Sequence, residues 1–151
     1  MKSNSFKKLL VVSLLTLPAF AISAFEAEFA IAIHGGAGAI SKAKMTPQKR
    51  ANYEKKLTQA VNTGYRLLEQ GKPSQAAIIA AIQVLEESPL FNAGRGSVYT
   101  FEGTHELDAS IMDGKTLNAG AVSGVKNVKS PIALAEQVME NSVHVMLSGE
   151  G

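Results

Sequence analysis

The sequence of 151 residues contains no cysteine. It can therefore form no disulfide framework, no thiolate metal site and no cysteine nucleophile, which suits an oxidising compartment without requiring one. The three histidines, His34, His105 and His144, are far apart and lack the spacing of metal ligands. The sequence predicts no zinc site.

A complete phosphate-binding P-loop is also lacking. The segment Asp113–Thr116 (DGKT) is similar to the end of that motif, but Ala109 stands where the motif requires glycine. A P-loop also needs a helix after the loop, and here strands are expected on both sides. We interpret this segment as a hairpin turn.

A glycine-rich segment follows the predicted strand over residues 29–33. It comprises His34, Gly35, Gly36 and Gly38. Main-chain amides of such a loop can stabilise a developing oxyanion. Lipase-like hydrolases combine this feature with a G-x-S-x-G turn, and that turn is absent from the sequence. We interpret the cluster, taken alone, as a structural glycine loop.

The first 24 residues have the pattern of a secretory signal peptide. Three lysines precede an apolar run, LLVVSLLTLPAFAI, which small residues follow. The run is shorter than the roughly 20 apolar residues of a membrane span and contains Pro18, although an uncleaved anchor is the alternative. Cleavage is expected after Ala21 to Ala24. The sequence predicts export, to a bacterial periplasm, with no membrane attachment after cleavage.

The remaining residues, 25–151, carry no basic stripe. They contain 12 basic and 13 acidic residues, which gives a net charge of −1. Nucleic-acid-binding domains carry clustered lysine and arginine, so we expect no nucleic-acid partner. This length suits a single domain.

Hydrophobic periodicity predicts an α+β domain. Thr46 and Pro47 begin a helix that Gly71 ends, and Ser74 caps a second helix that is apolar nearly all round and is expected between layers. Period-two segments separated by Glu102-Gly103 and Asp113-Gly114 turns predict consecutive hairpins in an antiparallel sheet. The expected strands are 29–33, 97–101, 104–113, 117–125 and 143–147, with a further helix over 131–141.

Five segments together resemble the amino-terminal part of the isoaspartyl peptidase/L-asparaginase family, the plant-type asparaginases among the N-terminal-nucleophile hydrolases. The resemblance runs from about Ala30 to Gly151. The segments, in the family's order, are IAIHGGAGAI, LEESPLFNAGRGSVYT, THELDASIMDGKTLNAGAVSGV, SPIALAEQVM and HVMLSGEG.

The resemblance implies an αββα sandwich, incomplete in this chain, whose precursor cuts itself into two subunits. The cut exposes a threonine nucleophile, and its own α-amino group serves as the base. The implied substrates are β-aspartyl dipeptides and L-asparagine, bound only by the complete enzyme, and αβ units pair as dimers. The nucleophile belongs to the carboxy-terminal subunit, so residues 1–151 contain no catalytic residue and are expected to be inactive alone.

The resemblance also assigns supporting roles to the loop after the second helix. Asn92 matches an asparagine beneath the nucleophile. A structural sodium ion is implied, and no other cofactor. Arg95 stands where related chains often have an apolar or small residue, but only its carbonyl is needed. The implied sodium ligands are the main-chain carbonyls of Leu85, Glu86, Ser88, Phe91, Ala93 and Arg95.

Two hypotheses follow. The chain is the amino-terminal portion of an exported hydrolase of this family, or it is a catalytically inactive truncated relic or a non-enzymatic partner subunit. Sequence downstream with a Gly-Thr-Val-Gly pattern would favour the first.

Overall fold

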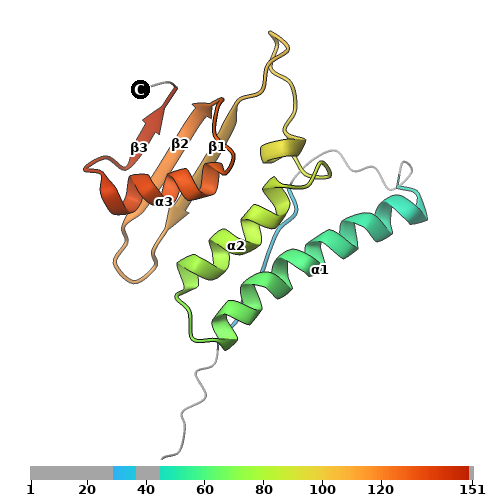
Figure 1. Ribbon diagram of the computed structural model, residues 1–151, viewed down its shortest axis with the longest axis horizontal. Coiled ribbons are helices and arrows are strands. Elements are labelled where there is room, and N and C mark those ends of the chain that lie inside the picture. Colours follow the sequence, from blue (N-terminus) through green and yellow to red (C-terminus); the bar gives the residue numbers. More distant parts are fainter. Residues whose placement is uncertain (1–28, 37–44, 150–151) are drawn as a thin grey trace, which may run out of the picture.

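The computed structural model describes residues 29–36 and 45–149 (Figure 1). The expected signal peptide and Gly38 lie outside these residues. Two long helices form a hairpin, and a small sheet with one helix across it follows in the chain (Figure 1). The elements are α1 (Pro47–Glu69), α2 (Ser74–Glu86), the short 3-10 helix η2 (Gly94–Gly96), β1 (Leu107–Met112), β2 (Ala119–Val125), α3 (Pro131–Asn141) and β3 (Met146–Ser148).

Helix α1 begins and ends where its sequence signals predict. The Thr46 hydroxyl accepts a hydrogen bond from the Lys49 N–H at 3.2 Å, and Pro47 is the first helical residue. Gly71, just past the end, has a φ of +70°. Helix α1 packs closely on α2 at Gly64, where an added Cβ would lie 2.8 Å from the Ala77 carbonyl oxygen.

Helix α2 differs from expectation at its start. Pro73 holds the N-cap position in extended backbone, and Ser74 is the first helical residue, without a side-chain cap. With Ser74 as the cap, the first helical residue would be Gln75, so the helix starts one residue earlier than predicted. Proline fixes its own φ but has no side-chain oxygen that could accept a capping hydrogen bond. Ile79 is buried, whereas Ile78 is partly exposed, so α2 is buried on most but not all of its surface.

The expected strand over residues 29–33 does not form. Among the described residues no strand pairs with this segment, and extended backbone becomes a strand only when a neighbour satisfies its N–H and C=O groups. The segment instead contacts α1. The centroids of the Phe29 and Tyr65 rings are 5.2 Å apart, and Ile31 packs against Gly64.

The sheet is mixed, not purely antiparallel, with strand order β1-β2-β3. Strands β1 and β2 form the predicted antiparallel hairpin, but β3 runs parallel to β2. Parallel neighbours need a crossover, and α3 supplies it by lying across one face of the sheet (Figure 1). The pairing is irregular between Leu107 and Ala109, where the Asp108 carboxylate accepts hydrogen bonds from Ser123 Oγ at 2.8 Å and Gly124 N at 2.9 Å.

Residues 97–101 form no strand either. The predicted turn is present, since the Thr100 N–H donates to the Thr104 carbonyl at 2.8 Å and the Gly103 N–H to the Thr100 carbonyl at 3.0 Å. No ladder extends from it, and Phe101 at its tip is fully exposed. A hairpin without a packed face is marginal in water, which explains why the alternation gives only a turn here.

Two hydrophobic clusters hold the described residues together. Ile79 joins the first cluster, between α3 and the sheet, and Phe91 belongs to the second, between α1, α2 and the loop after α2. Within residues 29–36 and 45–149, none of the helices has the length and apolar character that a membrane crossing requires.

Candidate functional site

The loop that follows α2 is anchored by two buried side chains. Phe91 is buried, and its ring meets the ring of Tyr53 from α1 edge to face at 5.5 Å between centroids. Ser88 is also buried, and its hydroxyl accepts a hydrogen bond from the Leu90 N–H at 3.3 Å. The loop is therefore fixed on α1 at its middle.

Two glycines allow main-chain oxygens to crowd together in this loop. An added Cβ on Gly96 would lie 2.2 Å from the Phe91 oxygen and 2.8 Å from the Ser88 oxygen. On Gly94, whose φ is +49°, it would lie 2.5 Å from the Glu86 oxygen. Any side chain would occupy the space beside these oxygens, so the bend requires glycine at both positions.

Several of these oxygens accept no hydrogen bond from the residues that the structure describes. Among the described residues, no donor reaches the main-chain oxygens of Glu86, Ser88, Phe91 or Arg95. Those of Leu85 and Ala93 each accept one bond, from the N–H groups of Ser88 at 3.1 Å and Gly96 at 3.0 Å. Carbonyl oxygens in this number suit a hard cation, and a carbonyl that accepts one bond keeps a second lone pair. The residue set predicted from the sequence therefore fits a cation.

The candidate cation ligands of this loop are all main-chain oxygens. In the described part of the chain, no group of three or more histidine, aspartate or glutamate side chains is placed to hold a metal ion.

His34, the first residue of the glycine loop, accepts a hydrogen bond on Nδ1 from the Gly36 N–H at 3.1 Å. An added Cβ on Gly35 would lie 3.2 Å from the Phe91 ring. The structure thus brings the two glycine loops together at Phe91.

Asn92 faces a cavity of about 380 Å³ between the loop and β1. Its side-chain oxygen accepts a hydrogen bond from the Val98 N–H at 2.9 Å. This bond fixes the amide plane, and among the described residues no acceptor contacts its NH₂ group. Asn92 is therefore oriented as a hydrogen-bond donor at the edge of a cavity that Asp108 and Ser110 of β1 also line.

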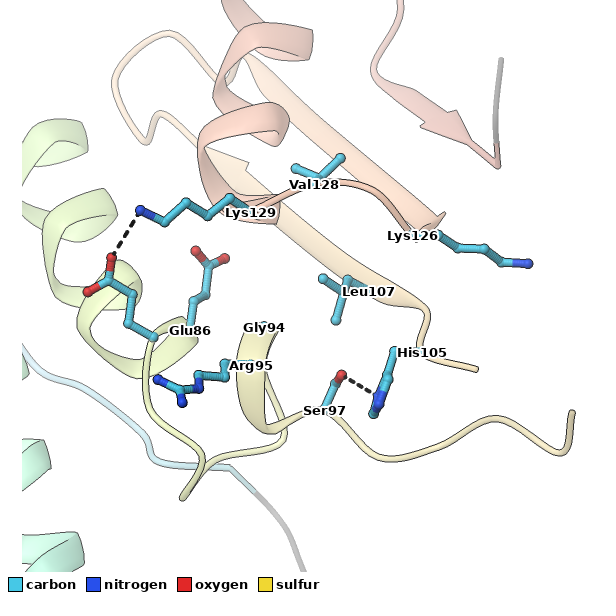
Figure 2. A pocket seen from close by; sticks show the side chains of 10 residues that line it. Glu86, Gly94, Arg95, Ser97, His105, Leu107, Lys126, Val128 and Lys129 are labelled. Carbon is cyan, nitrogen blue, oxygen red and sulfur yellow. Dashed lines mark hydrogen bonds and ion pairs between the residues drawn. The ribbon is translucent and has the colours of Figure 1, made fainter. Parts of the chain in front are cut away.

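A second cavity, of about 580 Å³, lies between the same loop, the start of β1 and the segment before α3 (Figure 2). Its lining carries charges of both signs, since Arg95, Lys126 and Lys129 are basic and Glu86 and Glu87 are acidic. Lys129 pairs with Glu87 at 3.7 Å, and His105 Nδ1 lies 3.0 Å from Ser97 Oγ. Figure 2 shows the Arg95 side chain directed away from Glu86.

Sequence reasoning assigned Glu86 only a main-chain role, and the structure adds a side-chain role. Glu86 is 4% exposed and reaches the first turn of α3. Its Oε1 accepts a hydrogen bond from the Ile132 N–H at 2.9 Å, and its Oε2 accepts one from the Ser130 hydroxyl at 2.7 Å. The carboxylate caps α3, because Ser130 holds the N-cap position without a side-chain cap hydrogen bond of its own.

Comparison with known proteins identifies the family of the chain. Residues 27–151 match the family model described as asparaginase. The isoaspartyl peptidase of Escherichia coli is 53% identical over 121 residues, which are 80% of this chain and 38% of that protein. The plant-type L-asparaginase of Pyrococcus furiosus is 50% identical over 122 residues, which are 81% of this chain and 38% of that protein.

A vertebrate relative gives the same result. The isoaspartyl peptidase/L-asparaginase of Danio rerio is 41% identical over 121 residues, 80% of this chain and 37% of that protein. The chain thus spans well under half the length of the curated relatives that it matches. The chain belongs to the asparaginase family, the isoaspartyl peptidase/L-asparaginase family that its sequence motifs resemble.

Proposed function

We propose that the chain is the amino-terminal portion of a hydrolase that cleaves β-aspartyl (isoaspartyl) dipeptides and L-asparagine. The nucleophile is a threonine freed by autoproteolysis, and it lies outside residues 1–151. The identity to proteins named isoaspartyl peptidase and L-asparaginase, over only 38% of their length, supports both parts of the proposal. A carboxy-terminal subunit supplies the remaining groups, and αβ units pair as dimers.

The observation that carries this function is the orientation of Asn92. Its oxygen is held by the Val98 N–H, no acceptor among the described residues contacts its NH₂ group, and the residue lines the cavity between the loop and β1. A donor fixed in this way can hold a strand that brings a threonine to the cavity. Asn92 has a supporting role in this proposal, and the reacting groups come from the carboxy-terminal subunit.

The exposed face of the sheet supports an αββα sandwich. Helix α3 covers one face, where Ile111 and Val122 are buried. On the other face, Asp108, Ser110 and Met112 are exposed among the described residues. One face of the sheet is therefore uncovered among the described residues, and in the proposed sandwich a second sheet about 10 Å away would pack on it.

We also propose that the loop binds sodium through the main-chain oxygens of residues 85–95. A bound cation would hold the loop in shape and would take no part in bond breaking. Residues 1–24 are proposed to direct export, to a bacterial periplasm, and to be removed there. No nucleic-acid partner is proposed.

The full-length gene product tests the function. It should release ammonia from L-asparagine and the second amino acid from a β-aspartyl dipeptide, and denaturing gels should show two chains, one of them beginning with threonine. A polypeptide ending at residue 151 should be inactive in the same assays. Turnover by that shorter polypeptide would place a nucleophile within residues 1–151 and overturn the proposal.

The cation site is tested separately by thermal unfolding in sodium chloride or choline chloride at equal ionic strength. Sodium should raise the unfolding temperature of the full-length protein, because it binds only the folded loop. Gly96→Ala should abolish this increase, since its methyl group would lie 2.2 Å from the Phe91 oxygen. Gly114→Ala, in open space, should keep it. An equal sodium response in both variants would contradict the site.

A further inference from the structure

Glu86 carries a buried carboxylate that has no basic partner within residues 29–36 and 45–149. It is 4% exposed, and among the described residues no lysine or arginine forms an ion pair with it. Lys129, which lies just before α3, pairs with Glu87 instead. A buried carboxylate is costly unless hydrogen bonds and a positive charge compensate for the lost water.

The compensation visible in the structure comes from α3. Ser130 and Ile132 each donate one hydrogen bond to the carboxylate, and Gln83 Nε2 donates to Ser130 Oγ at 3.2 Å. The N-terminus of an α-helix adds about half a positive charge. The half charge of the helix N-terminus is smaller than the unit negative charge of the Glu86 carboxylate, so part of that negative charge is not compensated.

The same residue contributes to the oxygen-lined loop. The Glu86 main-chain oxygen lies beside Gly94, and its side chain leaves in the direction of α3 (Figure 2). Carbonyl oxygens carry no net charge, so a cation bound to them also lacks a counter-charge. The lining of the adjoining cavity also includes basic residues: Lys126 and Lys129 pair with Glu106 and Glu87, whereas the charge of Arg95 would oppose cation binding.

We propose that the Glu86 carboxylate is the counter-charge of the cation bound by the main-chain oxygens of residues 85–95. Cation binding then strengthens the contact between this loop and α3, because both meet at one residue. The inference rests on the proposed cation site and does not depend on which substrate is hydrolysed. Glu86 is a positioning residue in this account.

The direct test replaces the charge and keeps the shape. Glu86→Gln retains an oxygen for the Ile132 N–H, and its NH₂ group can face the Ser130 hydroxyl. In the full-length protein, the sodium concentration at half-saturation should rise roughly fivefold to tenfold, as expected for losing a negative charge near the bound ion. Binding is followed by ²³Na NMR and by the unfolding temperature, with choline chloride holding the ionic strength constant.

Glu87→Gln is the matched control. Glu87 is the next residue and also an acid, but its side chain is 68% exposed and pairs with Lys129 at the surface. Water and salt screen an exposed charge, so half-saturation should change by less than about twofold. An equal effect of both substitutions would indicate general electrostatics and overturn the specific role of Glu86.

Two further variants separate charge from helix capping. Ser130→Ala removes one donor and keeps the carboxylate, so sodium affinity should stay near wild type while the unfolding temperature falls. Glu86→Asp keeps the charge with a shorter reach, and it should bind sodium even if Glu86→Gln does not fold. A loss of sodium binding in Glu86→Asp and Ser130→Ala equal to that in Glu86→Gln would assign the effect to capping and overturn the proposal.

The outcomes distinguish the two proposals. If the wild-type protein shows no sodium response, the cation site fails, and the role of Glu86 fails with it. If wild type binds sodium and Glu86→Gln binds it equally well, only the counter-charge role fails. Absence of hydrolase activity, with sodium binding and its loss in Glu86→Gln intact, would contradict the enzymatic function alone.

Discussion

A methyl group on Gly120 of β2 would lie 2.1 Å from the main-chain oxygen of Ala135 in α3. It would also lie 2.6 Å from the Met139 nitrogen. Both neighbours are main-chain atoms of one helix, so they cannot rotate away. The close contact between α3 and the sheet therefore depends on glycine at this position.

Gly120→Ala should destabilise the protein by about 3 kcal/mol, because overpacking here must move the whole helix away from the sheet. Urea unfolding of the full-length protein, followed by circular dichroism, measures the change. Gly114→Ala is the control, since nothing lies within 4 Å of an added Cβ there. It should be neutral or stabilising by less than about 1 kcal/mol. Equal stability of the two variants would show that α3 does not pack on β2 in this way.

The sequence predicts the parts of this fold that depend on neighbouring residues. Thr46 and Pro47 set the start of α1, and the turn at Asp113-Gly114 sets the β1–β2 hairpin. The strand predicted over residues 29–33 fails because alternation cannot supply a pairing partner. The parallel pairing of β3 was missed because it depends on how α3 crosses the sheet.

The same distinction applies to the site. The glycines at positions 94 and 96 mark the loop in the sequence, since few other residues permit such a bend. The side-chain role of Glu86 was not predicted, because its partners lie 44 and 46 residues further along the chain. Its one local signal is an acid at the end of an otherwise apolar helix.

Leu117 is in a left-handed conformation, with a φ of +65°, and its side chain is exposed. The left-handed conformation costs a leucine about 1–2 kcal/mol of folding free energy, whereas asparagine and glycine tolerate it. Leu117→Asn should therefore stabilise the full-length protein by roughly 1 kcal/mol in urea unfolding. Leu117→Ala keeps the unfavourable conformation and should change stability less. A destabilised Leu117→Asn would show that the leucine side chain has a packing partner.

Asp113 gives the β1–β2 turn a dependence on pH. Its carboxylate accepts hydrogen bonds from the Lys115 N–H and the Thr116 hydroxyl, each at 2.9 Å, and these bonds lower the pKa of Asp113 below its ordinary value of 3.8. Since the folded pKa is the lower one, the stabilisation is complete above the unfolded value and disappears as pH falls through the folded value. The stability advantage of wild type over Asp113→Asn should thus diminish in acid.

Thr116→Val supplies the check on this assignment. Loss of the hydroxyl donor should raise the pKa of Asp113 toward 3.8, as measured by NMR titration of its carboxyl carbon. The Lys115 N–H bond remains in this variant, so part of the lowering should persist. A pKa of Asp113 unchanged by Thr116→Val would assign the lowering to the main-chain donor alone.

Asn92→Asp tests the site with little change in shape. The substituted side chain can still accept the Val98 N–H, but it replaces the NH₂ donor with an oxygen. If that donor holds the strand of the nucleophile, autoprocessing or kcat should fall by about tenfold or more, while the unfolding temperature changes little. Asn118→Asp, in the β1–β2 turn, changes the same chemical group away from both cavities and should keep full activity. Normal processing and normal kcat in Asn92→Asp would contradict the supporting role of the Asn92 NH₂ group in the proposed function.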